Sequence, residues 1–415
     1  EEIYNAGTAL DCRDHSAYLS SELVSNNDFT DNTLNTSGTS TTEWTRYQAG
    51  ASTASISNGV ATLSIDGSNS NVVIHQADIF ESGKIYKISL VAKASADFSI
   101  TFRESQGATT SNTPSTALIA AVPLTTEYKT FEYTFTATGD QGDIFIGRNL
   151  GDTAGQNQTV TIDSISIKEI QTVGYWRNNG SDTWTDLSPY GNDGTVNGSP
   201  TTIQLQEVPY FKKDTLGLPM NKVRERGLNC NGDGYLKIDD SSDFDFGTTG
   251  FTIQAWVKPF SLTANDRIIT KGKTDAAEWM ISIGADNASV RVFAEDSGNA
   301  NLDSASNFST LSLNTWAMIT VVIDTPNDQI LFYKDDGNVE TYSTGTWSGN
   351  FNGAAPLIIG ANEALDADRF DGIIDDVKIY NKVLTAAEKT KNYKKGLATH
   401  KNTSTWSDDF DPSFV

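Results

Sequence analysis

Short segments in which apolar and polar residues alternate constrain the fold of this chain more than any other feature of its sequence. Between about residues 22 and 170 they include residues 88–90, 98–102, 131–135 and 160–162. Each segment places apolar side chains on one face with a period of two residues, as half-buried antiparallel strands require. Many short strands separated by Gly, Asn, Ser and Thr predict a sandwich or jelly roll.

The same alternation returns between about residues 173 and 383. The strand candidates there are residues 251–257, 279–283, 290–293, 316–323 and 329–333. A helix signal follows them, because Thr385 and Glu388 form a Thr-x-x-Glu capping box that predicts a helix through Lys395, ended by Gly396. We therefore predict an all-β fold, with two tandem antiparallel jelly-roll sandwiches and one short C-terminal helix.

These patterns divide the 415 residues into four parts. Residues 1–21 share Tyr, Gly and Ala spacing with the end of the predicted helix, so we expect the tail of a preceding module or a linker. Residues 22–170 form the first jelly roll, and residues 171–400 form the second, with a charged insertion at about 202–226. Residues 401–415 form an acidic, aromatic tail, either docked on a neighbouring subunit or disordered.

Several motifs of the second region resemble concanavalin A-like lectin/glucanase modules of the laminin-G-like type. They are residues 173–176, 187–195, 234–238, 251–259, 314–316, 357–360 and 370–380. The two ends of the first region, residues 22–29 and 160–170, resemble the galactose-binding-like jelly roll of carbohydrate-binding modules. Tandem modules of these types also resemble the surface proteins of tailed bacteriophages.

The charge of the chain excludes some partners. Thirty Lys and Arg stand against 53 Asp and Glu, a net charge of −23 that repels nucleic acids and anionic membranes. Local motifs for a serine nucleophile, a zinc hydrolase and a phosphate loop are missing. The Glu-x-Asp-x-x-Glu spacing of related β-glucanases is also missing, and the acidic run from Asp239 to Asp245 is typical of a loop. We therefore expect a protein that is not an enzyme.

Calcium is the metal that the resemblance implies, since jelly rolls of this kind use it to join their terminal strands. It needs several hard oxygens from Asp, Asn and backbone carbonyls. The candidate ligands are Asn26, Asp28 and Asp163 in the first module, and Asp233, Asp371 and Asp376 in the second. The alternative is that these residues only form turns in an acidic protein. Strand alternation places Ile162 and Asp163 on opposite faces.

Sugar binding requires exposed aromatic faces together with polar groups for hydroxyls. Trp256, Trp316 and Trp279 lie within strand patterns and are expected in the core. The candidate sugar-binding residues lie beside turn-forming residues or carry a guanidinium, and they are Trp44, Tyr47, Trp347 and Arg369. Each aromatic candidate can instead pack at the rim of its module, and Arg369, like Arg291, can instead pair with a carboxylate.

The sequence favours one function over a second. We expect a non-enzymatic protein on the virion surface, a head decoration, head fibre or tail adhesin, whose lectin-like domains contact host glycans. Its partners are then other virion proteins, and many copies act together. The alternative is a set of accessory carbohydrate-binding modules of a secreted bacterial polysaccharide-degrading enzyme, or a cell-surface adhesin.

Overall fold

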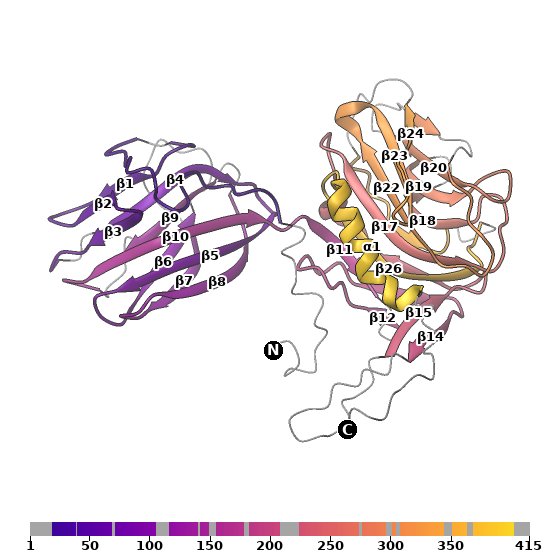
Figure 1. The fold of residues 1–415 in the computed structure, drawn as a ribbon, viewed down its shortest axis with the longest axis horizontal. Helices are drawn as coiled ribbons and strands as arrows, with labels where there is room; N and C mark the ends of the chain where they lie inside the picture. Colours follow the sequence, from indigo (N-terminus) through magenta and orange to yellow (C-terminus); the bar gives the residue numbers. More distant parts are fainter. Residues whose placement is uncertain are drawn as a thin grey trace, which may run out of the picture. The chain divides into compact units, whose positions relative to one another are not determined.

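The computed structural model describes residues 19–38, 40–68, 71–104, 116–139, 142–148, 155–177, 182–207, 224–273, 276–295, 301–303, 308–343, 351–362 and 368–401. The chain forms two compact units, one ending at Gln171 and the other beginning at Thr172 (Figure 1). Each unit has its own hydrophobic core. The predictions for residues 1–18 and 402–415 lie outside the described residues.

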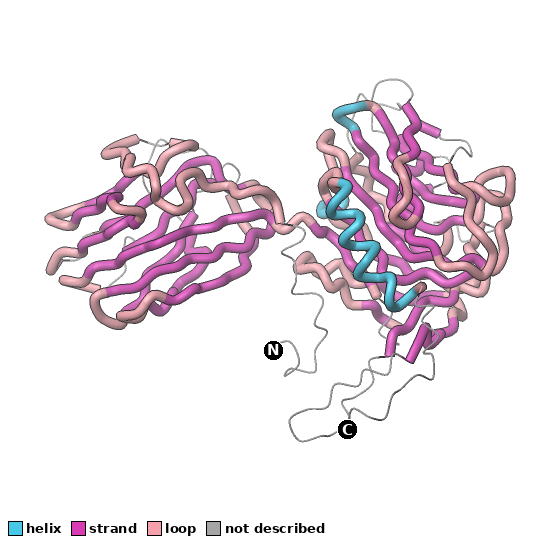
Figure 2. Tube along the Cα trace, in the orientation of Figure 1, coloured by secondary structure: helices cyan, strands magenta, loops and turns pink. Residues whose placement is uncertain are grey.

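The N-terminal domain is a sandwich of two five-stranded antiparallel sheets (Figure 2). The sheet that we call the front sheet contains, in spatial order, β1 (Thr45–Gln48), β4 (Val72–Phe80), β9 (Gly142–Arg148), β6 (Phe98–Glu104) and β7 (Thr116–Leu124). The back sheet contains β2 (Thr53–Ser57), β3 (Val60–Ser64), β10 (Thr159–Glu169), β5 (Ile85–Ala94) and β8 (Lys129–Thr136). Every strand pair is antiparallel, which confirms the predicted class of fold.

The C-terminal domain packs two larger sheets against each other. The helix-covered sheet contains β14 (Thr201–Glu207), β15 (Arg224–Asn229), β26 (Gly372–Tyr380), β17 (Phe251–Pro259), β22 (Ala317–Asp324), β23 (Gln329–Lys334) and β24 (Glu340–Ser343), with β11 (Thr172–Trp176) paired to β26. The open sheet contains β12 (Thr183–Trp184), β13 (Gly194–Asn197), β16 (Tyr235–Ile238), β25 (Leu357–Ile359), β18 (Arg267–Lys273), β19 (Ala276–Ile283), β20 (Val290–Glu295) and β21 (Asn301–Asp303). The first and last strands of this domain, β11 and β26, therefore lie side by side.

The predicted insertion begins and ends in regular structure. Its flanks form the hairpin partners β14 and β15, and β15 continues the sheet onto β26. Residues 208–223, between the two strands, lie outside the described residues. Two short 3-10 helices, η4 (Ser242–Phe244) and η5 (Thr325–Asn327), interrupt the connections between strands.

The single α-helix within the described residues, α1 (Ala386–His400), begins as predicted but ends later. The Thr385 hydroxyl accepts from the Glu388 amide, and the Glu388 carboxylate accepts from the Thr385 amide, so the capping box is confirmed. The prediction that Gly396 ends the helix is wrong. A Cβ atom on Gly396 would lie 2.2 Å from Nε1 of Trp256, so this glycine lets the helix pack directly on the sheet.

Helix α1 covers the outer face of β17 and β26 (Figure 2). Because side chains alternate along β17, Trp256 faces this helix while its neighbours Ala255 and Val257 face the core. No helix in the described ranges is long and apolar enough to cross a membrane.

Candidate functional site

One row of side chains crosses the outer face of the front sheet. Thr45 on β1 lies opposite His75 on β4, His75 lies opposite Phe145 on β9, and Phe145 lies opposite Arg103 on β6. Neighbouring residues such as Ile74 belong to the core, so strand alternation points this row away from the core. The face therefore combines a hydroxyl, an imidazole, an aromatic ring and a guanidinium.

A second row runs beside the first. It places Tyr47 opposite Val73, Val73 opposite Gly147, and Gly147 opposite Thr101. Gly147 has a φ of 137°, and a Cβ atom there would lie 2.5 Å from the Val72 carbonyl oxygen, so only glycine fits this position. Tyr47 stands at the edge of the face and is half-buried.

Two polar side chains of the first row, Thr45 and His75, are buried without a hydrogen-bond partner among the described residues. Thr45, His75 and Phe145 are each 0% exposed. Within the described part of the chain, neither ring nitrogen of His75 has a hydrogen-bond partner, and neither does the Thr45 hydroxyl. Buried polar groups in proteins are nearly always paired, with water where no protein group serves, so a water molecule or a ligand is the expected partner of these atoms.

The electrostatics of this face favour neutral chemistry. Burial lowers the pKa of His75 to about 4, so the ring is uncharged near pH 7 and offers one donor and one acceptor. The ring lies parallel to Phe145, with centroids 4.8 Å apart. Burial also raises the pKa of Asp143 on β9, although its carboxylate accepts from the Asp78 amide at 3.2 Å.

The outer face of the open sheet has a comparable arrangement. One row runs through Lys237, Ile358, Thr270, Met280 and Phe293 on five adjacent strands. The intervening residues of these strands form the core, so this row faces outward. The three central members are buried, with at most 3% of their surface exposed.

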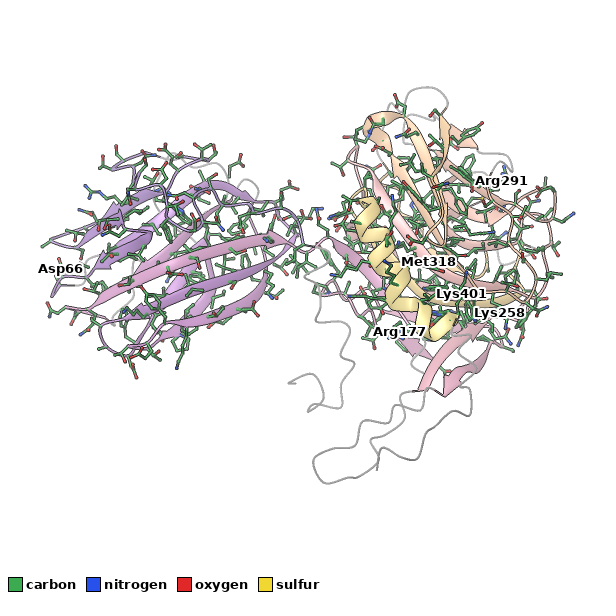
Figure 3. The ribbon with its side chains drawn as sticks, viewed as in Figure 1. Asp66, Arg177, Lys258, Arg291, Met318 and Lys401 are labelled. Atoms are coloured by element: carbon green, nitrogen blue, oxygen red, sulfur yellow. The ribbon has the colours of Figure 1, made fainter. Side chains whose placement is uncertain are left out.

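A second outward row of the open sheet contains Arg267, Ser282 and Arg291. Arg267 is buried and pairs with Asp368 at 3.1 Å. Arg291, labelled in Figure 3, donates to the Asn265 side chain at 3.3 Å. The hydroxyls of Ser282 and of Thr270 in the neighbouring row are buried and have no partner among the residues described, so this face too holds unsatisfied polar groups.

The predicted sugar-binding residues meet different outcomes. Trp44 is 0% exposed, packs near Phe29 in the core and donates from Nε1 to the Asn26 carbonyl at 3.2 Å, so it presents no ring face for a sugar. Tyr47 lies on the front face. Trp347 lies outside the described residues. Arg369 donates to the carboxylate of Asp233 and, at 3.1 Å, to the carbonyl of the same residue.

The tryptophans expected in the core differ in their surroundings. Trp279 is buried between the two sheets of its domain. Trp256 is equally buried, but beneath α1 rather than between the sheets. Trp316 is half-buried and contacts the ring of His400 edge-on, so it lies at the border of the helix contact.

The first predicted calcium set lies in turns. The Asn26 side chain donates to and accepts from the backbone of Asp31, and Asp28 accepts from the amide and hydroxyl of Thr30. Asp163 sits at a bulge in β10 and is exposed, while Ile162 is buried, as alternation predicted. The loop and the strand do meet, since the Ile165 amide donates to the Asn27 carbonyl at 2.8 Å.

The second predicted set is divided between two places. Asp233 and Asp371 lie at the same end of the domain, where Arg369 occupies the Asp233 carboxylate. Asp376 lies five residues further along β26, roughly 15 Å away in an extended strand. There its buried carboxylate pairs with Lys378 at 3.1 Å and with Arg177 at 3.7 Å.

Across the described ranges, no group of three or more His, Cys, Asp and Glu side chains is arranged to hold a metal. Of the predicted ligands, Asn26 and Asp28 form turns, and Asp233 and Asp376 form ion pairs. Calcium binding stays a prediction from the sequence.

Sequence reasoning missed the buried polar groups of both outer faces. The sequence does carry a signal for the burial of His75. The segment Val72-Val-Ile-His-Gln76 has apolar residues at both odd and even positions, so both faces of this strand are apolar. A continuous apolar run indicates a strand buried on both faces, so a His within it must be buried as well. Thr270 and Ser282 give no such signal, since each follows the ordinary alternation of a half-buried strand.

Comparison with known proteins agrees with this architecture. Residues 231–388 match the model of the concanavalin A-like lectin/glucanases superfamily, and residues 21–146 match that of a carbohydrate binding domain family. Both resemblances are thereby confirmed. The lectin-like domain and the carbohydrate-binding-module-like domain follow each other in one chain. No curated protein matches the sequence.

Comparison with solved structures finds matches that cover parts of the chain. Domain 4 of AbnA, an extracellular arabinanase from Geobacillus stearothermophilus, in complex with arabinotriose, is 17% identical over 53% of this chain and 97% of that one, with a TM-score of 0.38. A CBM4 structure is 23% identical over 35% and 99%, with a TM-score of 0.30. The binding domain of Paraclostridial Mosquitocidal Protein 1 is 17% identical over 54% and 52%, with a TM-score of 0.40. The match thus spans about half the length of that binding domain.

Proposed function

We propose that the chain is a non-catalytic glycan-binding protein whose principal sugar site is the outer face of the front sheet. The observation that carries the proposal is the pair of buried, unpartnered groups, His75 and Thr45, beside Phe145. Leaving a buried polar group unsatisfied costs about 1–3 kcal/mol. Because His75 and Thr45 are 0% exposed, a ligand hydroxyl recovers this cost only if the groups that cover them move aside when the sugar binds. The match of this domain to a carbohydrate binding domain family supports the same assignment.

The chemistry of the face suits a neutral saccharide. An uncharged imidazole donates one hydrogen bond and accepts another, as does a hydroxyl, so His75 and Thr45 match the mixed donors and acceptors of a sugar. The ring of Tyr47 at the edge of the face provides an apolar surface for the C–H side of a pyranose. Thr270 and Ser282 on the open sheet form a second, smaller set of the same kind.

The acidic residues of the C-terminal domain support binding without hydrolysis. Asp240 is paired with Lys271 at 2.8 Å, and Asp243 accepts from Ser241 and from Asn192. Retaining glycosidases need one carboxylic acid and one carboxylate facing each other across the glycosidic bond. Carboxylates tied into turns and ion pairs do not provide such a pair.

Two settings for this activity follow from the sequence. In the first, the chain is displayed in many copies on a virion surface, where the net charge of −23 keeps neighbouring copies soluble and avidity strengthens weak sites. In the second, the chain supplies accessory modules to an extracellular polysaccharide-degrading enzyme or an adhesin. The matches to carbohydrate-binding and lectin families support both settings equally.

The test of the proposal is a screen of the full chain against immobilised neutral and acidic polysaccharides, with a parallel assay for new reducing ends. We expect retention on at least one neutral polysaccharide and no release of reducing sugar. Absence of retention on all of them, or release of reducing ends, would contradict the proposal. The particle size of the native assembly separates the two settings, since a virion protein sediments with particles.

A further inference from the structure

The outer face of the back sheet carries a row of polar side chains that crosses four strands (Figure 1). Ser55 on β2 lies opposite Thr62 on β3, and Thr62 lies opposite Thr161 on β10. On β5, Lys93 lies opposite Thr161 and continues the row. Ile162, the neighbour of Thr161 in β10, belongs to the core, so strand alternation directs the row away from the core.

An exposed aromatic ring stands at the end of this row. Tyr128 directly precedes β8, and Lys129, the first residue of β8, lies opposite Ala92 of β5, so Tyr128 comes beside Lys93. The Lys93 ammonium lies 4.6 Å from the centroid of the Tyr128 ring. Tyr128 is 42% exposed and is the single exposed aromatic side chain among the residues that the structure describes.

A bulge in β10 brings a carboxylate to the same place. The register between β10 and β5 shifts between Ile162 and Ser164, so Asp163 is the extra residue of the bulge, and its side chain is exposed. Burial raises the pKa of Tyr128 and the negative charge of Asp163 raises it further, so the carboxylate lies near the phenol. Within the described ranges, neither Lys93 nor Asp163 forms an ion pair, which leaves both charged groups open to a ligand.

The chemistry of these three side chains suits a neutral sugar. An ammonium only donates hydrogen bonds and a carboxylate only accepts them, so Lys93 and Asp163 together match neighbouring hydroxyl groups of one sugar. The Tyr128 ring offers a surface for the C–H side of the same sugar. A polyanion would be repelled by Asp163, and an apolar ligand would remove water from both charges without replacing its hydrogen bonds.

The row is long enough for several sugar residues. Five positions separated by about 4.8 Å, the spacing between strands, extend over roughly 19 Å from Tyr128 to Ser55. Each of the three hydroxyl groups along it can donate and accept a hydrogen bond. The contacts are exposed to water, so a single short chain binds weakly, and the site is effective toward a polymer that many sites share.

We propose that Tyr128, Lys93 and Asp163 form a second saccharide site on the outer face of the back sheet, where a neutral polysaccharide chain lies along the row of hydroxyl groups. The N-terminal domain then binds glycan on both of its outer faces and can join two chains. This site rests on the proposed glycan-binding function of the domain, but it does not depend on the front sheet.

Hydroxyl-radical footprinting of the full chain, read by mass spectrometry, tests the site residue by residue. The probes are soluble xylan, arabinan and mixed-linkage β-glucan. We expect at least one of them to lower the oxidation rate of Tyr128 roughly twofold or more, because a stacked sugar covers the ring. Leu313 in the C-terminal domain, 51% exposed, is the internal control and should oxidise at an unchanged rate. The protection of Tyr128 should persist in His75→Phe.

Affinity electrophoresis in gels that contain the same polysaccharide tests the contacts, with each variant made both in the wild type and in His75→Phe. Loss of the stacked ring in Tyr128→Ala predicts binding about fivefold weaker. Loss of a hydrogen bond from a charged group in Lys93→Gln predicts binding about tenfold weaker. The matched control is Thr134→Ala, which lies opposite Lys87 at the other end of β8, roughly 20 Å from Tyr128, and should bind unchanged.

The outcomes separate this site from the front-sheet site. A Tyr128 oxidation rate that none of the polysaccharides changes would overturn the proposal, as would unchanged binding by both Tyr128→Ala and Lys93→Gln. Protection of Tyr128 together with unchanged binding by His75→Phe would support the back-sheet site and refute the front-sheet site. Loss of binding in His75→Phe without protection of Tyr128 in the wild type would refute the back-sheet site alone.

Discussion

His75 lies flat against Phe145 on the neighbouring strand, with ring centroids 4.8 Å apart and planes 12° apart. The two residues are direct cross-strand neighbours, so the sheet itself fixes the imidazole at this position. The stack covers one face of the imidazole. Neither ring nitrogen has a hydrogen-bond partner among the described residues. A rigid, uncharged and unsatisfied imidazole is the feature from which the proposed sugar site follows.

The burial of His75 makes the N-terminal domain sensitive to acid. Because its pKa is lowered to about 4, against 6.5 in the unfolded chain, the unfolded state binds the extra proton first as the pH falls. The stabilisation is complete above pH 6.5 and is lost toward pH 4, amounting to about 2.5 kcal/mol by pH 4.5. Urea unfolding at pH 7 and pH 4.5 measures the loss.

The control for that measurement is His75→Phe, which keeps the stack on Phe145 but cannot bind a proton. Carboxyl groups elsewhere in the chain also titrate between these pH values. The informative quantity is therefore the difference between the two proteins in the free energy of unfolding that each loses. We expect His75→Phe to lose about 2.5 kcal/mol less than the wild type. Equal losses would show that His75 is protonated in the folded protein.

The Trp44 side chain stabilises the core of the N-terminal domain and does not contact the sugar. Its side chain is fully buried near Phe29, so Trp44→Phe should lower the free energy of unfolding by about 1–3 kcal/mol through the cavity it leaves. Glycan affinity at a temperature where the variant is folded should stay within twofold of the wild type. If the folded Trp44→Phe variant has lost its affinity for the glycan, Trp44 contacts the sugar and this prediction is wrong.

Gly396 permits the close contact between α1 and Trp256. In Gly396→Ala the new Cβ atom would meet Nε1 of Trp256 at 2.2 Å, and overpacking of this kind costs about 1–3 kcal/mol. Alanine favours a helix by about 1 kcal/mol over glycine, so a purely helical effect would have the opposite sign. Thermal unfolding compares this variant with Lys395→Ala, whose side chain is exposed and whose effect should be within about 0.5 kcal/mol.

Asp186 organises the start of the C-terminal domain. Its buried carboxylate accepts from the amides of Tyr175, Ser188 and Asn192 and from the Ser188 hydroxyl, at 2.8–2.9 Å. Asp186→Asn would turn an NH2 group toward these donors, so we expect a loss of about 2–4 kcal/mol in stability. The exposed Asp182→Asn is the matched control in chemical unfolding, and equal stability of both variants would contradict this role.

The sequence predicts the layers of this protein better than its sites. Period-two alternation locates strands in both domains, because the pattern depends only on which face of a strand is buried. The environment of Trp44 depends instead on Phe29, which lies before the first strand and packs against the indole ring, so the polar neighbours of Trp44 in the sequence predicted the wrong environment. The same holds for Gly396, whose role is set by Trp256, about 140 residues earlier in the chain.

Charged residues are the hardest to place. Asp376 is one of several similar carboxyl groups in the sequence, and only the register of β26 brings it to Lys378 and Arg177. The burial of His75 could be predicted from the apolar residues around it in the sequence. The lack of hydrogen-bond partners for its ring could not be predicted, because it depends on which residues of the neighbouring strands β1 and β9 lie beside the ring.

The most direct test of the account is titration calorimetry of the full chain with neutral oligosaccharides, namely cellohexaose, xylohexaose and arabinotriose. The wild type is compared with His75→Phe, which keeps the stack on Phe145, and with Thr134→Ala on the exposed face of the back sheet. Loss of two hydrogen bonds at about 0.5–1.5 kcal/mol each predicts an affinity roughly 5- to 150-fold weaker for His75→Phe and unchanged for Thr134→Ala. An affinity of His75→Phe equal to that of the wild type would contradict the central claim.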